Sequence, residues 1–196
     1  VEADAVVVAI PAAPARSLVA PLDEGFEHAL AAIPAAGLAV VALAYDAKDI
    51  GRAADGFGFL APRGEALRVL GCLWDSSIFP GRAPAGKVLL RAMIGGALDP
   101  AAVLLSDEEL LAEVRADLGK AMGLAAAPER VWIFRHPGGI GQYTVGHQAR
   151  LDQLAAAETR HPGLHLAGQS YYGISMNACI EKAAPLADRV LTAVAP

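Results

Sequence analysis

The stretch that most constrains the fold runs from Leu164 to Ile180. It combines a short apolar run, a turn marked by Gly168 and Gly173, and the beginning of a long helical pattern. A helix N-terminus exposes unpaired backbone N–H groups and the positive end of the helix dipole, and a glycine lets another group approach the backbone closely. Two interpretations follow. The stretch is a tight strand-to-helix connection of an α/β fold, or it holds an electron-rich group such as a phosphate or a carboxylate.

The composition indicates a folded chain of one or two domains. The sequence has 196 residues, of which 55% are hydrophobic, so it can bury a core and intrinsic disorder is disfavoured. Sixteen Lys and Arg against 21 Asp and Glu give a net charge of −5, without the basic patch that nucleic-acid binding requires. We therefore expect no nucleic-acid partner.

The cysteines and the first residues indicate a cellular location and a larger parent protein. Cys72 and Cys179 lie far apart in no metal-like spacing, so we expect two reduced thiols and a cytoplasmic protein. The chain opens at Val1 inside an apolar run without a basic segment, unlike a signal peptide. We expect it to be a piece of a longer protein that begins within a fold.

The hydrophobic pattern predicts a mixed α/β fold. The first run suits a buried strand of a parallel sheet covered on both faces, whereas short connections between the middle strands favour antiparallel pairing. Ser106 and Glu109 form a capping box, and Pro185 predicts a kink or a break in the last helix. The predicted strands are 4–10, 37–45, 57–61, 67–75, 87–95 and 130–135, with a loop at 137–141. The predicted helices are 22–33, 106–122, 147–159 and a final helix that begins at about 171–173.

The familiar catalytic motifs are missing or incomplete. The segment Gly81–Lys87 has phosphate-loop spacing, but Val88 replaces the magnesium-binding hydroxyl residue and Lys87 opens a strand instead of a helix. No glycine fingerprint for dinucleotides, zinc-ligand spacing or nucleophile elbow is present. Nucleotide hydrolysis, zinc chemistry and nucleophilic catalysis are therefore disfavoured.

The three middle strands collect large apolar side chains. Their simplest role is a hydrophobic core. Because alternate residues of a strand face opposite ways, Phe57 and Phe59 would share one face and Gly58 would leave the other face open. A sheet with glycine gaps and soft residues such as Met93 can also wall a large flat ligand.

A resemblance to a known family rests on six segments that occur in the family's order over almost the whole chain. The chain resembles the C-terminal part of the protoporphyrinogen oxidase family, FAD enzymes of haem and porphyrin biosynthesis within the amine-oxidase-like flavoprotein superfamily. Gly141, Ala178 and Pro185 depart from the family pattern. The matching segments are Ala9–Pro11, Gly56–Leu60, Val69–Ser76, Met93–Gly96, Gln142–His147 and Leu166–Asn177.

The resemblance implies an α/β (mixed α+β) architecture in two parts. One is the C-terminal part of a Rossmann-like FAD-binding domain, and the other is a substrate domain with a mixed, largely antiparallel sheet flanked by helices. Residues 1–16 would form a strand returning into the FAD domain. Residues 17–160 would form the substrate-binding domain, and residues 161–196 a strand and helix of the FAD domain.

The resemblance also implies where ligands bind. Residues of the final segment would contact FAD, and apolar residues of the middle strands would line the porphyrinogen pocket. No catalytic side chain and no metal are implied. The implied cofactor-binding residues are Gly168, Gly173, Ile174, Ser175 and Met176, and the implied substrate-binding residues are Phe57, Leu60, Leu73 and Met93.

The activity implied is oxidation of protoporphyrinogen IX to protoporphyrin IX, in which a bridging carbon gives a hydride to the flavin and molecular oxygen reoxidises the flavin. The chain would be inactive alone, because the half with the glycine fingerprint is not in these residues. The sequence leaves open coproporphyrinogen as substrate, a homodimer, and peripheral contact with the inner face of a membrane. The alternative is a flavin-free module that binds a tetrapyrrole or another planar ligand.

Overall fold

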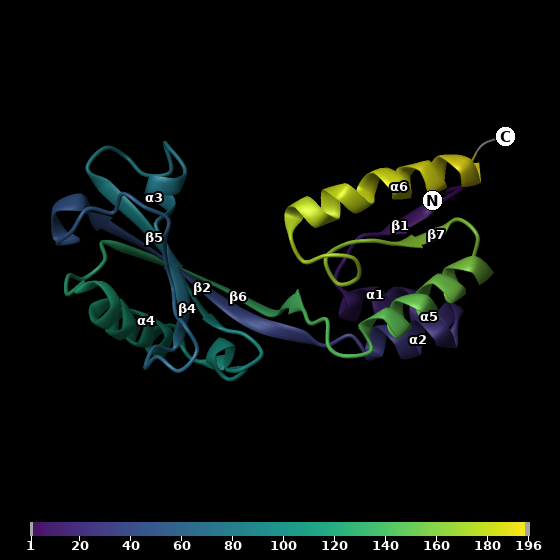
Figure 1. The fold of residues 1–196 in the computed structure, drawn as a ribbon, viewed down its shortest axis with the longest axis horizontal. Helices are drawn as coiled ribbons and strands as arrows, with labels where there is room; N and C mark the ends of the chain where they lie inside the picture. Colours follow the sequence, from purple (N-terminus) through teal and green to yellow (C-terminus); the bar gives the residue numbers. More distant parts are fainter. Residues whose placement is uncertain (1, 195–196) are drawn as a thin grey trace. The chain divides into compact units, whose positions relative to one another are not determined.

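The computed structural model of the protein describes residues 2–194, which divide into two compact units. Unit 1 combines the residues up to 36 with those from 138 onward, and unit 2 is the continuous segment 37–137. Figure 1 shows the elements of each unit. We describe each unit by itself.

Unit 2 is built on a five-stranded sheet with the order β3-β4-β5-β2-β6. Neighbouring strands run antiparallel where β2 meets β5, where β3 meets β4 and where β4 meets β5, which confirms the pairing predicted for the middle strands. The strands are β2 (Ala35–Asp46), β3 (Gly58–Leu60), β4 (Val69–Leu73), β5 (Lys87–Gly95) and β6 (Arg130–Gly141), and a short helix α3 (Asp75–Ile78) precedes β5.

Helix α4 (Asp107–Met122) covers one face of this sheet. Its predicted capping box is present: the Ser106 hydroxyl accepts the Glu109 N–H, and the Glu109 carboxylate accepts the Ser106 N–H. Gly123 ends the helix in a left-handed conformation. Alternate residues of β2 and β5 point towards α4 and form the core of unit 2 with it: Val41, Leu43, Leu90, Ala92, Leu110, Val114 and Leu118.

A buried carboxylate joins α4 to the start of β4. Asp117 is 1% exposed, and its Oδ2 accepts the backbone N–H of Arg68 at 2.6 Å and of Val69 at 3.0 Å. Its Oδ1 accepts a hydrogen bond from Lys120 Nζ at 3.0 Å. Charge-assisted bonds of this kind are stronger than neutral ones, so Asp117 fixes the position of β4 on the helix.

Two of the differences between the predicted and observed strands of unit 2 have a clear structural cause. β6 continues through Pro137 to Gly141, where a loop was expected. Because β6 is an edge strand, it tolerates a proline that lacks an N–H group. The strand predicted to Asp75 ends at Leu73, since the chain turns into α3.

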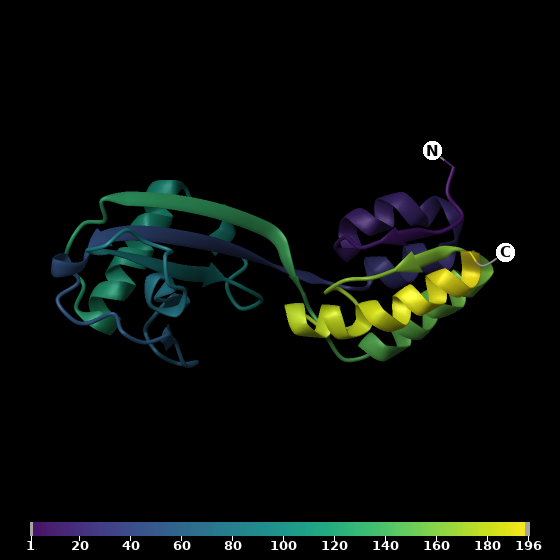
Figure 2. The same ribbon diagram turned by 90° about the horizontal axis from the view of Figure 1, so that it is seen from above.

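Unit 1 contains a parallel strand pair with helices on both sides. β1 (Val6–Val8) pairs with β7 (Leu164–Leu166). Val8 and Leu166 pack against helices α1 (Ala12–Val19), α2 (Glu24–Ala31) and α5 (His147–Arg160), and helix α6 (Met176–Val194) lies on the other side of the pair, as Figures 1 and 2 show.

Two expectations for unit 1 need correction. The first strand was predicted to be buried over residues 4–10, but β1 has three residues and the side chains of Val6 and Val7 are exposed, because β7 is its one neighbour in the described chain. Of the two outcomes expected at Pro185, a kink or a break, the break does not occur, since α6 is continuous around Pro185. No helix of residues 2–194 is both long and apolar enough to cross a membrane.

The bounds of units 1 and 2 differ from the predicted domain bounds. The helices α1, α2 and α5 fall within the segment 17–160 predicted as the substrate domain, yet they pack on the β1–β7 pair and belong to unit 1. The division into two compact units does not show which unit binds a cofactor and which binds a substrate. The functional assignment of the three segments therefore stays a prediction.

Asp23 clamps α2 to the end of α5. Its carboxylate caps α2 by accepting the Gly25 N–H at 2.7 Å, and it receives two hydrogen bonds from Arg160, both at 2.7 Å. His161 Nε2 lies 3.2 Å from the same carboxylate. These contacts hold the pKa of Asp23 well below its ordinary value of 3.8. The hydrogen bonds from Arg160 have the largest effect, and the hydrogen bond from the Gly25 N–H has the next largest.

This clamp predicts an acid-sensitive unit 1. A carboxyl group whose pKa is depressed by folding contributes stability above its unfolded pKa, and the contribution is lost as the pH falls towards the folded pKa. We expect the unfolding midpoint of unit 1, followed by far-UV circular dichroism, to fall as the pH drops below about 5. Asp23→Asn should start lower at neutral pH and show a flatter acid branch. An equally steep acid branch in Asp23→Asn would assign the sensitivity to other groups.

Candidate functional site

The predicted cofactor-binding segment forms a looped turn between β7 and α6 in unit 1. The turn begins at Gly168, whose carbonyl accepts the Tyr171 N–H, and ends at Gly173. Gly168 and Gly173 have φ angles of +112° and +142°, which favour glycine. A Cβ on Gly173 would also lie 2.3 Å from the Cβ of Ala178. The path of this turn therefore depends on glycine at both ends.

Side chains and backbone from three other elements hold the turn. The buried Ser170 hydroxyl accepts the N–H of Ala12 at the start of α1. Gln169 Nε2 donates to the Gly139 carbonyl of β6 at 2.9 Å, and His147 Nε2 at the start of α5 donates to the Tyr171 carbonyl at 2.9 Å. The turn is thus fixed by bonds to distant parts of the chain and not by its local sequence alone.

Tyr143 joins the two ends of the turn. Its hydroxyl accepts the Gly173 N–H and donates to the Gln169 carbonyl, both at 2.6 Å. The ring stacks on His147, with ring centroids 4.0 Å apart and planes at 11°. Burial raises the pKa of Tyr143, so the hydroxyl keeps its proton and can donate.

The first turn of α6 leaves backbone donors without acceptors. The Ser175 hydroxyl accepts the Ala178 N–H at 3.1 Å, and the Ser175 carbonyl accepts the Cys179 N–H. Among residues 2–194, no acceptor receives the N–H of Met176 or Asn177. Ile174 and Met176, the latter 79% exposed, flank these donors. The structure thus brings the five predicted residues onto one short turn and helix start.

In unit 2 the strand register gathers three of the four predicted substrate residues on the sheet face opposite α4, which we call the open face. Leu60 pairs with Gly71, and Gly71 pairs with Met93. Directly paired residues point to the same side, and Leu73 follows Gly71 by two positions on that side. Leu60, Leu73 and Met93 are therefore neighbours on the open face.

Phe57 does not join this group. It precedes β3, and its side chain is 76% exposed. Its neighbour Phe59 packs into the core on the α4 side, so the two phenylalanines do not form one buried face as expected. The role predicted for Phe57 in a site is not supported by its place in unit 2 and stays a prediction.

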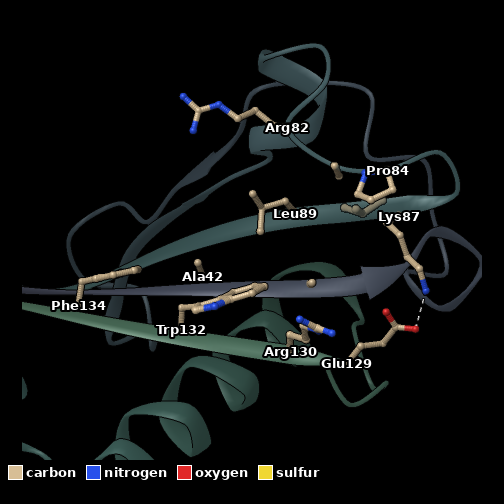
Figure 3. A pocket seen from close by; sticks show the side chains of 12 residues that line it. Ala42, Arg82, Pro84, Lys87, Leu89, Glu129, Arg130, Trp132 and Phe134 are labelled. Atoms are coloured by element: carbon tan, nitrogen blue, oxygen red, sulfur yellow. Dashed lines mark hydrogen bonds and ion pairs between the residues drawn. The ribbon is translucent and has the colours of Figure 1, made fainter.

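A hollow of about 650 Å³ lies on the open face over β5, β2 and β6. Figure 3 shows its floor, where the small Ala42 lies between Leu89 and Trp132. The lining residues are Ala42, Ala44, Arg82, Ala83, Pro84, Lys87, Val88, Leu89, Glu129, Arg130, Trp132 and Phe134. None of the four predicted substrate residues lines it.

The sequence contained a signal for this hollow that the motif search missed. In β6 the residues Arg130, Trp132 and Phe134 alternate with Val131 and Ile133, which pack towards the core. Such alternation in an edge strand indicates a second, exposed aromatic face. What the pattern could not give was the partner strands, since β2 and β5 come from distant parts of the sequence.

The buried cysteine of unit 2 is not set up as a nucleophile. Burial raises the pKa of Cys72 to about 12, so its thiol stays protonated. No group of His, Cys, Asp or Glu residues in the described part of the chain could hold a metal ion. Both units offer shape, apolar surface and backbone donors, which suit a reaction whose chemistry a cofactor supplies.

The chain belongs to the flavin containing amine oxidoreductase family, whose sequence pattern matches residues 1–191. It is 31% identical over 192 residues to coproporphyrinogen III oxidase of Bacillus subtilis, covering 97% of this chain and 40% of that protein. It is 35% identical over 198 residues to human protoporphyrinogen oxidase, covering 97% of this chain and 41% of that protein. The resemblance found in the sequence is thereby confirmed.

Solved structures agree on the fold. A protein of Exiguobacterium sp. 255-15 matches with a TM-score of 0.79 and 27% identity over 96% of this chain and 41% of that chain. Reduced UDP-galactopyranose mutase matches with a TM-score of 0.72 at 11% identity over 99% of this chain and 44% of that chain, which shows the fold alone. The chain spans about two fifths of the length of the relatives it matches.

Proposed function

We propose that this chain forms part of an oxygen-dependent, FAD-containing porphyrinogen oxidase that converts protoporphyrinogen IX to protoporphyrin IX. One observation carries the proposal: the ordered turn and helix start at 168–177 lie in a chain that aligns over 97% of its length with porphyrinogen oxidases. The remaining three fifths of the relatives' length has no counterpart here, so activity belongs to the complete protein.

The residues of the helix start fit the polar edge of an isoalloxazine ring. The unpaired N–H groups of Met176 and Asn177 offer donors to electron-rich ring atoms, and the positive end of the α6 dipole favours negative charge there. The exposed side chains of Ile174 and Met176 supply apolar contact. A bound FAD would supply hydride acceptance; the turn residues would orient it and hold the charge that develops.

The open face fits the other reactant. A porphyrinogen is a large apolar macrocycle, and Leu60, Leu73 and Met93 give apolar contact surface. Arg91, which pairs with Leu73 and points to the same side, is already bound by the Asp75 carboxylate. The task of the three apolar residues is to position the macrocycle and exclude water, because hydride removal needs no nucleophile from the protein. Molecular oxygen is the proposed second substrate.

We extend the proposal to the cellular setting. The two free cysteines, one of them buried, support a cytoplasmic location. Peripheral contact with the inner face of the membrane is a further part of this proposal. A homodimer is a further proposal, supported by the exposed apolar residues Ile180 and Leu191 on α6. Separation of membrane and soluble fractions and light scattering of the purified protein test both points.

The decisive experiment joins this chain to the part of the Bacillus subtilis relative that it does not cover, where we expect the glycine fingerprint for FAD and which we call the FAD half. We expect a yellow protein that turns over protoporphyrinogen IX in air, followed by the fluorescence of the porphyrin product. Coproporphyrinogen III is assayed in parallel, because relatives with both names match.

Three controls make the result decisive. The FAD half alone must be inactive, and the assay without oxygen must stop after the bound flavin is reduced. The hybrid with Ser175→Pro, which removes the cap of α6, should lose FAD retention. A flavin-loaded hybrid that oxidises neither porphyrinogen would refute the substrate assignment, and a colourless folded hybrid would refute the cofactor assignment.

A further inference from the structure

We propose that the hollow on the open face of unit 2 binds a flat tetrapyrrole that carries carboxylates, with Trp132 against the ring and Arg82 and Arg130 paired to the acidic groups. The choice of a tetrapyrrole rests on the proposed function, whereas the need for a flat, anionic, largely apolar ligand comes from the hollow itself. This is a site separate from Leu60, Leu73 and Met93, which do not line it.

The floor of the hollow suits a ring system. Ala42 and Ala44 carry single methyl groups where β2 crosses the middle of the open face, so larger neighbours stand above them on both sides. Trp132 and Phe134 are 43% and 53% exposed, which is unusual for large aromatic side chains on one strand face. Figure 3 shows the Trp132 ring lying along the floor below Leu89.

The size agrees with a ligand of this class. The hollow measures about 650 Å³, in the middle of the range of roughly 300–1,000 Å³ that small-molecule sites occupy. It is open on one side, which leaves room for ionised groups at the rim. A mainly apolar lining with a few placed charges is the usual pattern of such a site.

Two cations at the rim lack counter-ions. In the described chain, neither Arg82 nor Arg130 forms a hydrogen bond or ion pair through its guanidinium group, and Arg82 lies 5.2 Å from the ring centroid of Phe79. Figure 3 places the two arginines on opposite sides of the floor. Guanidinium groups bind carboxylates with two parallel hydrogen bonds, so this pair predicts a ligand with at least two acidic groups.

The third cation of the lining sets the orientation of the ligand. Lys87 is already neutralised, since its Nζ lies 2.9 Å from Asp46 and 2.6 Å from Glu129. The Glu129 carboxylate is part of the lining at that end and would repel another carboxylate. The acidic groups of the ligand are therefore directed away from Lys87 and towards Arg82 and Arg130.

The test is an equilibrium titration of the full chain with coproporphyrin III, followed by tryptophan quenching and the porphyrin absorption band. Arg82→Gln and Arg130→Gln should each weaken binding about tenfold and the double variant about a hundredfold, because each substitution removes a charge-assisted hydrogen bond to a ligand carboxylate. Trp132→Leu should also weaken binding about tenfold. Circular dichroism establishes that each variant is folded.

A matched arginine and a matched ligand serve as controls. Arg115→Gln changes an exposed arginine of α4, on the opposite side of the sheet, and should leave the affinity within about twofold. The tetramethyl ester of coproporphyrin III has the same ring without charges, and its weaker binding should not respond to Arg82→Gln or Arg130→Gln.

Each outcome bears on the proposal. No binding of coproporphyrin III at micromolar concentration, equal losses in Arg115→Gln, or equal affinity for the ester would overturn it. The titration needs neither flavin nor oxygen, so it fails independently of the oxidase experiment. If the hybrid oxidase is active but coproporphyrin III does not bind in the titration, only this inference is overturned. If coproporphyrin III binds but the hybrid shows no oxidase activity, only the proposed function is overturned.

Discussion

Replacing Asp117 with alanine is expected to lower the free energy of unfolding of unit 2 by about 3–5 kcal/mol. The carboxylate is buried and accepts the N–H groups of Arg68 and Val69, so the variant leaves two backbone donors unpaired at the start of β4. Lys120 loses one of its two acceptors and keeps the Ala66 carbonyl. Both tryptophans, Trp74 and Trp132, belong to unit 2, so denaturant unfolding followed by tryptophan fluorescence measures this loss.

The size of the effect depends on burial, which a control on the same helix tests. Glu108→Ala removes an exposed carboxylate from the first turn of α4 and should cost below about 1 kcal/mol. Asp117→Asn keeps one acceptor oxygen, so its loss in the free energy of unfolding should lie between those of Asp117→Ala and Glu108→Ala. Equal losses in Asp117→Ala and Glu108→Ala would show that the buried bonds do not hold β4 in place.

The variant Tyr143→Phe is expected to loosen the turn at 168–173 by about 1–3 kcal/mol, because two hydrogen bonds are lost at about 0.5–1.5 kcal/mol each. The ring remains and can still stack on His147, so the change isolates the hydroxyl. The Gly173 N–H loses its acceptor, and its hydrogen exchange should become at least roughly tenfold faster. In the complete oxidase that we propose, the same variant should release the proposed FAD more readily while the unfolding midpoint of unit 2 stays unchanged.

A neighbouring tyrosine provides the matched control. Tyr171 is 1% exposed, and its hydroxyl has no hydrogen-bond partner in the described structure. Tyr171→Phe should therefore leave stability unchanged or raise it, and Gly173 exchange should stay slow. Faster Gly173 exchange in Tyr171→Phe but not in Tyr143→Phe would contradict the bridging role of Tyr143.

The parts of the fold that local chemistry decides were predicted from the sequence. The capping box at Ser106 and the glycine at 123 set the limits of α4 within the residues expected. β5 has the predicted bounds, because turn residues flank it on both sides. The antiparallel order of β3, β4 and β5 followed from their short connections.

The parts that distant neighbours decide were not predicted. Pro137 indicated a loop, yet β6 continues through it because the strand lies at an edge of the sheet. The apolar run that contains Val6 and Val7 is typical of a buried strand, yet both side chains are exposed. Whether such a strand is buried depends on its neighbours in the fold, and the run itself does not specify them. Likewise, the sequence marked Gly168 and Gly173 as special, but it could not show that Tyr143 and Ser170 fix the turn between them.

The division of the chain also has a consequence for the order of folding. Unit 2 is continuous, so all of its contacts can form within residues 37–137. Unit 1 needs bonds between partners far apart in sequence: 158 residues separate Ala12 from Ser170, and 137 separate Asp23 from Arg160. Since closing long loops slows folding, unit 2 is expected to fold first, and the β1–β7 pair of unit 1 is expected to form later. The turn that we assign to the flavin is then among the last parts of the chain to take shape.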